Sequence, residues 1–181
     1  MRMPGHGRHI LLILLALFCA NVRAASKVEL DAEVEAATQA FYKTVGAGKA
    51  LARKAAGMLV FPSVLKGGFI VGAEYGEGAL LVGGKTVAYY NTASASFGLQ
   101  AGAQSKTMIV LFMSKSALEQ FRRSDGWKAG VDGNIAVATL GAGGEVSSQT
   151  AQEPIIGFVF GNKGLMADLS FAGTKITRIE K

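Results

Sequence analysis

The sequence predicts an α+β fold: a mainly antiparallel β sandwich or barrel with an N-terminal amphipathic helix and one short internal helix. Apolar residues alternate with polar residues or glycine through much of residues 69–100, which is typical of half-buried strands. Glycine occurs 24 times and proline 3 times, which favours tight turns over a helical bundle. No span of about 10–15 helical residues separates the later strands, so parallel crossovers are not expected.

The first 24 residues predict a secretory signal peptide. Arg2 and Arg8 precede an apolar run over residues 10–18, and Val22 and Ala24 stand where a signal peptidase reads small residues. The run is short for a membrane anchor. Bulky Phe18 before Cys19 argues against lipid attachment at that cysteine. Cleavage after Ala24 would leave a single domain over residues 25–181 and lower the formal charge from +6 to +3, because three arginines leave with the signal.

The segment 28–57 is expected to be helical. Val28, Leu30 and Val34 begin an apolar face that Phe41 extends, and Leu51 and Met58 continue it at helical spacing after a weak point at residues 46–48. Further along, residues 115–123 predict a short helix that Ser114 caps, with Leu118 and Phe121 facing inward. Trp127 is expected to plug the core, and a membrane-interface anchor is the alternative.

The remaining apolar segments predict short strands. Residues 107–113 are continuously apolar, so we expect them to form a central strand that is covered on both faces. The expected strands cover residues 69–75, 79–82, 86–90, 94–100, 107–113, 134–140, 144–149, 154–160, 164–171 and 174–179.

Residues 76–86 partly match the phosphate-binding loop of nucleotide-binding proteins. Gly84, Lys85 and Thr86 supply the end of the motif, but Ala79 stands where the first glycine is required. A phosphate loop also needs a helix after its lysine, whereas residues 86–90 have a β pattern. The segment is therefore predicted to be a hairpin without bound nucleotide.

The composition of residues 25–181 excludes several chemistries. Every histidine and cysteine of the chain, namely His6, His9 and Cys19, lies in the expected signal peptide. The remainder therefore has no residues for disulfides, common zinc sites, iron–sulfur sites, or Ser-His-Asp and Cys-His catalysis. No cofactor or metal site is expected. Glu74, Glu77 and Asp132 offer carboxylates for a hydrolase, but structural roles at turns are the preferred interpretation.

A basic stretch is the most suggestive feature. No acidic residue occurs between Ala36 and Ala73, while Lys43, Lys49, Arg53, Lys54 and Lys66 lie on and just after the expected helix. Such side chains can contact anionic lipid headgroups. The residues support an alternative equally well: bases near the end of a helix complement the helix dipole and need no external ligand. Nucleic acid is not an expected partner, because export and a small net charge both argue against it.

The order of several motifs resembles the SYLF domain, a lipid-binding family also described as an actin-regulator domain in eukaryotic members. The similarity begins with KAAGMLVFP (54–62) and KGGFIVGAEYGEG (66–78), and continues with YYN (89–91), SFGLQAG (96–102), GWKAGVDG (126–133) and FVFGNKGLM (158–166). This resemblance implies phospholipid binding, with phosphoinositides in eukaryotic relatives and involvement of an amphipathic N-terminal helix. It offers no catalytic residue. The actin role is not expected here, because the chain has an export signal and no SH3 or FYVE module.

Together these observations predict a non-enzymatic, exported, periplasmic domain that associates peripherally with anionic membranes. Lys49, Arg53, Lys54 and Lys66 are the predicted lipid-binding residues. Phosphatidylglycerol, cardiolipin and lipid A are the expected anionic lipids. A periplasmic protein-interaction module is the first alternative and a carboxylate-dependent hydrolase the second.

Overall fold

The structure is a computed structural model that describes residues 25–68, 71–97, 104–138, 146–161, 164–165, 171 and 173–181. The expected signal peptide and Cys19 lie outside these residues. The helical elements are α2 (Lys27–Thr44), α3 (Gly48–Lys54), α4 (Lys115–Arg123) and the 3-10 turn η1 (Thr150–Gln152). The strands are β1 (Gly57–Gly68), β2 (Val71–Val82), β3 (Lys85–Phe97), β4 (Gln104–Phe112), β5 (Trp127–Lys128), β6 (Ala136–Val137), β7 (Ile155–Gly161), β8 (Gly164–Leu165) and β9 (Lys175–Ile179).

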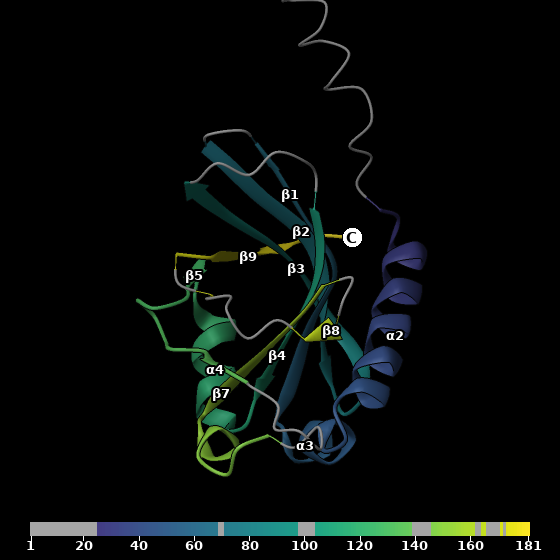
Figure 1. The fold of residues 1–181 in the computed structure, drawn as a ribbon, viewed down its shortest axis with the longest axis vertical. Helices are drawn as coiled ribbons and strands as arrows, with labels where there is room; N and C mark the ends of the chain where they lie inside the picture. Colours follow the sequence, from purple (N-terminus) through teal and green to yellow (C-terminus); the bar gives the residue numbers. More distant parts are fainter. Residues whose placement is uncertain are drawn as a thin grey trace, which may run out of the picture.

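All of these strands belong to one curled sheet with the order β5-β9-β3-β2-β1-β4-β7-β6, and β8 pairs with β7. The pairs are antiparallel except that β6 runs parallel to β7. In Figure 1, α2 lies on one side of the sheet, α4 lies on the other side, and α3 lies at the lower end. The predicted α+β class and antiparallel pairing are confirmed. The described strands form a half-barrel from one sheet, and a second facing sheet is not seen among them.

Each face of the sheet has its own apolar core. Strand β4 serves both, because Met108, Val110 and Phe112 face the α4 side while Ile109 and Leu111 face the α2 side. The predicted doubly covered central strand is therefore confirmed. The α4-side core includes Leu59, Phe61, Leu80, Leu118, Phe121 and Trp127, and the α2-side core includes Leu30, Val34, Phe41, Leu51, Met58, Val60 and Phe158. Trp127 is 2% exposed, so the core-plug interpretation is confirmed.

The expected continuous helix over 28–57 is wrong in two places. The helix stops at Thr44, because Val45 is extended (φ −103°, ψ 106°) and its N–H still bonds to the carbonyl of Phe41. Gly48 then restarts a helix against Phe41, and a Cβ at this glycine would lie 3.1 Å from the Phe41 ring. Strand β1 begins at Gly57, so Met58 belongs to a strand and not to the helical face. Val28 is 78% exposed, so its predicted place on the apolar face is also wrong.

The strands are longer than predicted. Segments 69–75 and 79–82 belong to one strand, β2, although residues 69–70 are not described, and 86–90 and 94–97 belong to one strand, β3. Both strands pair continuously across their middles, so the glycines of β2 do not form a turn. Strands β7 and β9 and helix α4 agree with prediction. Within the predicted strand 134–140 the structure describes only the two-residue strand β6, and within 164–171 only the two-residue strand β8. The described part of the predicted strand 144–149, residues 146–149, contains no strand.

Candidate functional site

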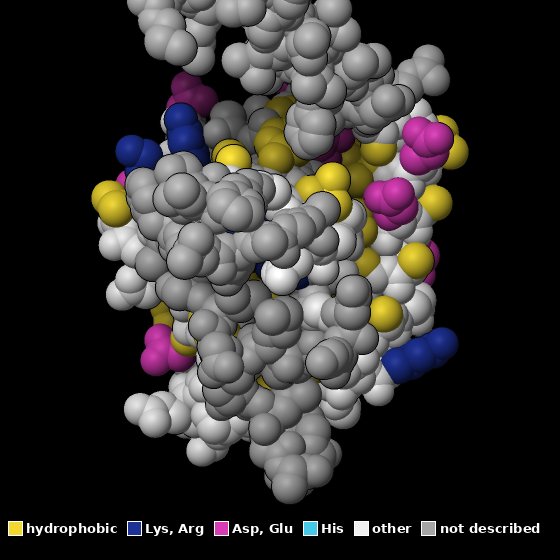
Figure 2. All heavy atoms as spheres, turned by 45° about the horizontal axis from the view of Figure 1, so that its top comes forward, with side chains coloured by type: hydrophobic (Ala, Val, Ile, Leu, Met, Phe, Trp, Pro, Cys, Tyr) yellow, Lys and Arg dark blue, Asp and Glu magenta, His cyan; other side chains and the backbone are white. Residues whose placement is uncertain are grey.

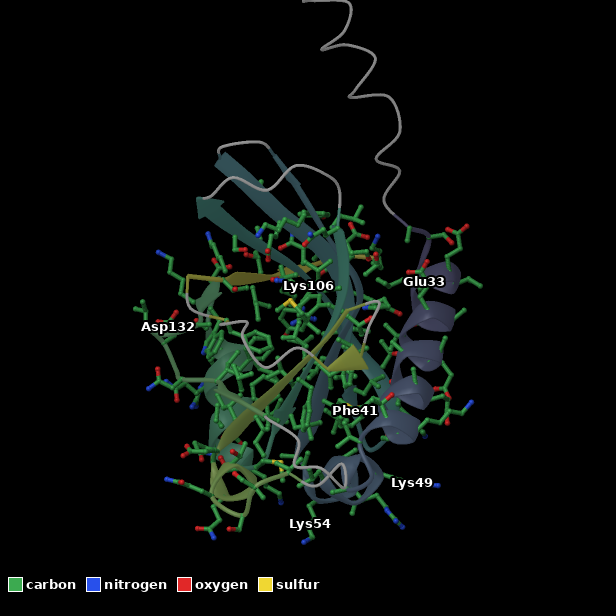
Figure 3. The ribbon with its side chains drawn as sticks, in the orientation of Figure 1. Glu33, Phe41, Lys49, Lys54, Lys106 and Asp132 are labelled. Atoms are coloured by element: carbon green, nitrogen blue, oxygen red, sulfur yellow. The ribbon has the colours of Figure 1, made fainter. Side chains whose placement is uncertain are left out.

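Helix α3 exposes three of the four predicted lipid-binding residues. The turn at residues 46–47 separates it from α2, and buried Leu51 anchors it to the α2-side core at 8% exposure. Lys49, Arg53 and Lys54 are exposed, and Figure 3 shows Lys49 and Lys54 pointing away from the sheet at the end of the molecule. Because Leu51 and Met58 are both buried, neither is available to insert into a lipid surface.

Two further bases lie at the same end of the fold. Lys43 is in the last turn of α2, and Lys85 opens β3 directly after the turn formed by Gly83 and Gly84. These glycines have φ values of 58° and 77°, which L side chains rarely adopt. The predicted hairpin at 76–86 is therefore confirmed, and β3 stands where a phosphate loop requires a helix. Sequence reasoning missed Lys85 as a site residue, because its spacing suggested only the phosphate loop.

No ion pair neutralises this basic end within the described residues. The four salt bridges found there join Lys27 to Asp31, Lys66 and Lys106 to Glu74, and Lys181 to Glu77. Lys43, Lys85 and the bases of α3 take part in none of them. Their charge is therefore available to an external anion, and the name basic end is used below for Lys43, Lys49, Arg53, Lys54 and Lys85.

The structure separates Lys66 from the other predicted residues. Lys66 lies nine residues beyond Gly57 in β1, which places it roughly 30 Å along the strand from α3 at about 3.3 Å per residue. Its side chain is 21% exposed, and its Nζ lies 3.9 Å from Glu74 Oε1. Glu74 also accepts hydrogen bonds from Lys106 at 2.7 Å and Ser94 at 3.1 Å. Lys66 therefore belongs to a polar network across four strands and not to the basic end.

A hollow of about 370 Å³ opens beside α3. It lies between the helix, the start of β1 and the β2–β3 turn. Its lining residues are Tyr42, Ala52, Arg53, Ala55, Gly57, Met58, Leu81, Gly83 and Gly84. The lining side chains are apolar except for Tyr42 and Arg53, so one residue with a hydroxyl and one with a positive charge border the hollow.

Burial and two nearby charges act on the pKa of the Tyr42 hydroxyl. Partial burial raises the pKa of the Tyr42 hydroxyl, the Glu35 carboxylate raises it further, and the Arg53 guanidinium lowers it. The phenol therefore stays protonated at neutral pH and can donate a hydrogen bond. Glu35 is the acid that opposes binding of an anion here.

The opposite end of α2 is acidic. Glu29, Glu33 and Glu35 are exposed along its first half, and Figure 2 shows carboxylates gathered on the α2 side towards the end that faces the viewer. Glu29 completes a capping box with Ser26, and the hydrogen bonds from the Ser26 backbone and side chain lower the pKa of Glu29. The domain therefore carries opposite charges at the two ends of α2.

A partly buried polar contact holds the acidic end in place. Asp31 accepts hydrogen bonds from Lys27 at 2.9 Å, Tyr89 at 2.9 Å and Thr86 at 3.2 Å. Burial raises the pKa of Asp31, but these three donors outweigh it and the net pKa is lowered. The hydrogen bonds to Tyr89 and Asp31 raise the pKa of Lys27 to about 12.

The carboxylates considered for hydrolysis are not brought together. Glu74 and Glu77 are three residues apart in β2, so they face opposite sides of the sheet. Each is engaged by lysine, Glu77 by Lys181 at 2.5 Å. Asp132 accepts a hydrogen bond from the Lys128 amide at 2.7 Å in its own loop, and Figure 3 shows it far from the labelled Lys106. The predicted position at a turn is wrong for Glu74 and Glu77, which lie within β2, whereas Asp132 lies in a loop as predicted.

Neither a metal centre nor a membrane-spanning helix occurs in the part of the chain that the structure describes. It contains no group of three or more His, Cys, Asp and Glu residues that could hold a metal ion. None of its helices is both long and apolar enough to cross a membrane.

Comparison with known proteins supports the resemblance seen in the sequence. No curated protein matches the chain. Residues 93–181 match the family described as "Ysc84: Las17-binding protein actin regulator", which is the SYLF family and is associated with lipid binding and actin regulation. The matched segment runs from β3 to β9 and includes α4, whereas the basic end lies outside it. The resemblance to the SYLF family is therefore confirmed over residues 93–181.

Proposed function

We propose that this protein is a non-enzymatic phospholipid-binding domain that associates peripherally with anionic membranes through its basic end. One observation carries the proposal: Lys49, Arg53 and Lys54 project from α3 into solvent, and none of them is paired with an acid among the described residues. Each Lys or Arg near an anionic membrane surface contributes about 1 kcal/mol of attraction. The family's association with lipids agrees with this proposal.

The structure changes the mechanism that the sequence suggested. Leu51 and Met58 are fixed in the core, so binding does not depend on their insertion. Lys66 is engaged with Glu74 and is no longer proposed as a headgroup contact. Attraction between charged headgroups and exposed bases is the proposed driving force, and it weakens with salt because mobile ions screen it.

Co-sedimentation with vesicles tests this function. Residues 25–181 are mixed with vesicles of phosphatidylcholine alone or with phosphatidylglycerol added, across a salt series. The triple variant K49E/R53E/K54E should lose at least about a hundredfold in partitioning to the anionic vesicles, since about 3 kcal/mol of attraction is removed and the new carboxylates add repulsion. The matched control K115E/R122E/R123E makes the same charge change on exposed positions of α4, on the other side of the sheet, and should retain binding. Equal losses in the two variants would contradict the assignment.

Export to the periplasm is part of the proposal and rests on the pattern of residues 1–24. It predicts that protein recovered from a periplasmic extract begins at Ala25 when its N-terminus is sequenced. Recovery of the intact N-terminus in the cytoplasm would contradict it.

A protein partner is the second candidate. Leu65 and Tyr75 face each other across β1 and β2 and are 57% and 42% exposed. An apolar pair on a sheet surface is suited to a protein contact. This function predicts saturable binding that is independent of vesicle charge and is lost in Leu65→Ser.

A further inference from the structure

We propose that the hollow beside α3 binds the headgroup of a single anionic phospholipid, with its phosphate held by Arg53. This inference rests on the proposed function and goes further, because it adds a stoichiometric site to the diffuse attraction between the basic end and a charged surface. The domain would then bind one lipid molecule at a time at the membrane surface.

The walls of the hollow suit an amphiphile. Met58 and Leu81 form apolar walls and are themselves 6% and 9% exposed, while the small side chains of Ala52 and Ala55 keep the space between them open. At Gly83 and Gly84, an added Cβ would meet no heavy atom within 4 Å. The β2–β3 turn therefore leaves room for a ligand to enter beside it.

The polar groups of the hollow suit a phosphate. The Arg53 guanidinium forms none of the ion pairs found among the described residues, and a guanidinium binds phosphate through two parallel hydrogen bonds. Tyr42 supplies a protonated hydroxyl near Arg53. Lys85, the residue after Gly84, adds positive charge beside the turn. Glu35 opposes this charge, which limits affinity but leaves the basic groups in excess.

The volume decides how much of the lipid enters. Sites for small ligands occupy about 300–1,000 Å³, and this hollow of about 370 Å³ is at the lower end. It can hold a glycerophosphate headgroup with the first methylenes against Met58 and Leu81. It cannot hold two full acyl chains, which therefore remain in the bilayer. The geometry points to recognition at the membrane surface and not to a carrier that encloses a lipid.

The test uses a soluble lipid, so that binding in the hollow is separated from adsorption to a surface. Dihexanoyl phosphatidylglycerol is titrated as a monomer into the chain from Ala25 onward, which contains all the described helices and strands. Calorimetry should give one lipid per protein, and the amide NMR signals of Gly83 and Gly84 should shift. Glycerol 3-phosphate, which lacks the acyl groups, should bind at least tenfold more weakly, and tighter or equal binding would indicate a site for a free phosphate instead.

Two variants locate the ligand. Ala52→Phe fills the hollow without a change in charge and should reduce affinity for the soluble lipid at least tenfold. Arg53→Gln removes the charged donor and should reduce it by roughly tenfold to a hundredfold. Because Arg53 is exposed, this second variant is expected to fold even if Ala52→Phe does not. Glu35→Gln should strengthen binding, since it removes the opposing charge.

The control K49E/K54E separates this inference from the proposed function. It should weaken adsorption to anionic vesicles while the soluble lipid still binds, and Ala52→Phe should show the reverse. If the soluble lipid does not bind or shift the glycine signals while vesicle adsorption still depends on α3, the inference is wrong and the proposed function stands. If vesicle adsorption is also independent of α3, the proposed function fails as well.

Discussion

Replacement of Gly78 by alanine tests how β1 and β2 are held together. Gly78 lies in the middle of β2 and pairs with Tyr90 of β3. A Cβ at this position would overlap the Val60 carbonyl oxygen and lie 2.6 Å from the Phe61 ring. Real Cβ atoms essentially never approach so closely, and the first obstacle is backbone, which cannot rotate away. Strand β1 must therefore move if alanine is introduced.

The size of the effect follows from two opposing contributions. In an unstrained strand, alanine is favoured over glycine by roughly 0.5–1 kcal/mol because the unfolded chain loses less entropy. Overpacking a tight site costs about 1–3 kcal/mol. Gly67→Ala is the matched control, since a Cβ there meets nothing within 4 Å and the position is exposed. The entropic gain is common to both variants, so they should differ in unfolding free energy by the overpacking cost of about 1–3 kcal/mol.

Urea unfolding measures this difference directly. Trp127 is the single tryptophan of the chain and is buried, so its fluorescence reports loss of the α4-side core. At about 2–4 °C per kcal/mol for a chain of this size, the melting temperatures should differ by about 2–12 °C. Equal stability of Gly78→Ala and Gly67→Ala would refute the close approach of β1 to β2.

Three further predictions concern the core, a pH-sensitive contact and the polar network. Phe41→Ala should cost about 3–5 kcal/mol in chemical unfolding, because Phe41 is 2% exposed, whereas Val28→Ala at 78% exposure should cost under about 0.5 kcal/mol. The pKa of Asp31 is lowered in the fold, so its stabilisation is present above its ordinary value of 3.8 and is lost as pH falls through the lowered pKa. Asp31→Asn should flatten this acid limb of a melting-temperature profile, and an unchanged profile would contradict the assignment. Glu74→Gln should cost about 3 kcal/mol by leaving Lys106 partly buried without its carboxylate, and the double variant with Lys106→Met should recover much of that loss if the two residues are coupled.

The basic end was partly predictable from the sequence. Lys49 and Arg53 are one turn apart in a short segment, so local spacing was enough to place both on the exposed side of α3. Lys66 could not be placed in the same way, because its position depends on whether residues 57–66 continue a helix or extend as a strand. A strand carries it roughly 30 Å from α3, where Glu74 engages it. The approach of the β2–β3 turn to Arg53 depends on tertiary packing, so it could not be predicted from the local sequence.

The boundary between α3 and β1 shows why periodicity failed here. Leu51 and Met58 have helical spacing, but Met58, Leu59, Val60 and Phe61 are all buried. Four consecutive buried residues fit a strand covered on both faces, and a run this short cannot be told from a buried helix by its pattern. Residues 58–61 form a strand because the fold has a second apolar core on the α4 side, which buries the side chains that point away from α2.

The sequence by itself determined the α+β class, the helix 115–123, the presence of an N-terminal helix that begins near residue 28, the central strand β4 and the hairpin around Gly83 and Gly84. These features depend on residues close together in the chain: caps, periodicity and turn glycines. The tertiary structure alone decided that the strands form one curled sheet, that Lys66 leaves the basic end, and that Arg53 borders a hollow. These depend on which distant segments pair and how closely they approach, and those energies arise from contacts that form when the whole sheet is assembled.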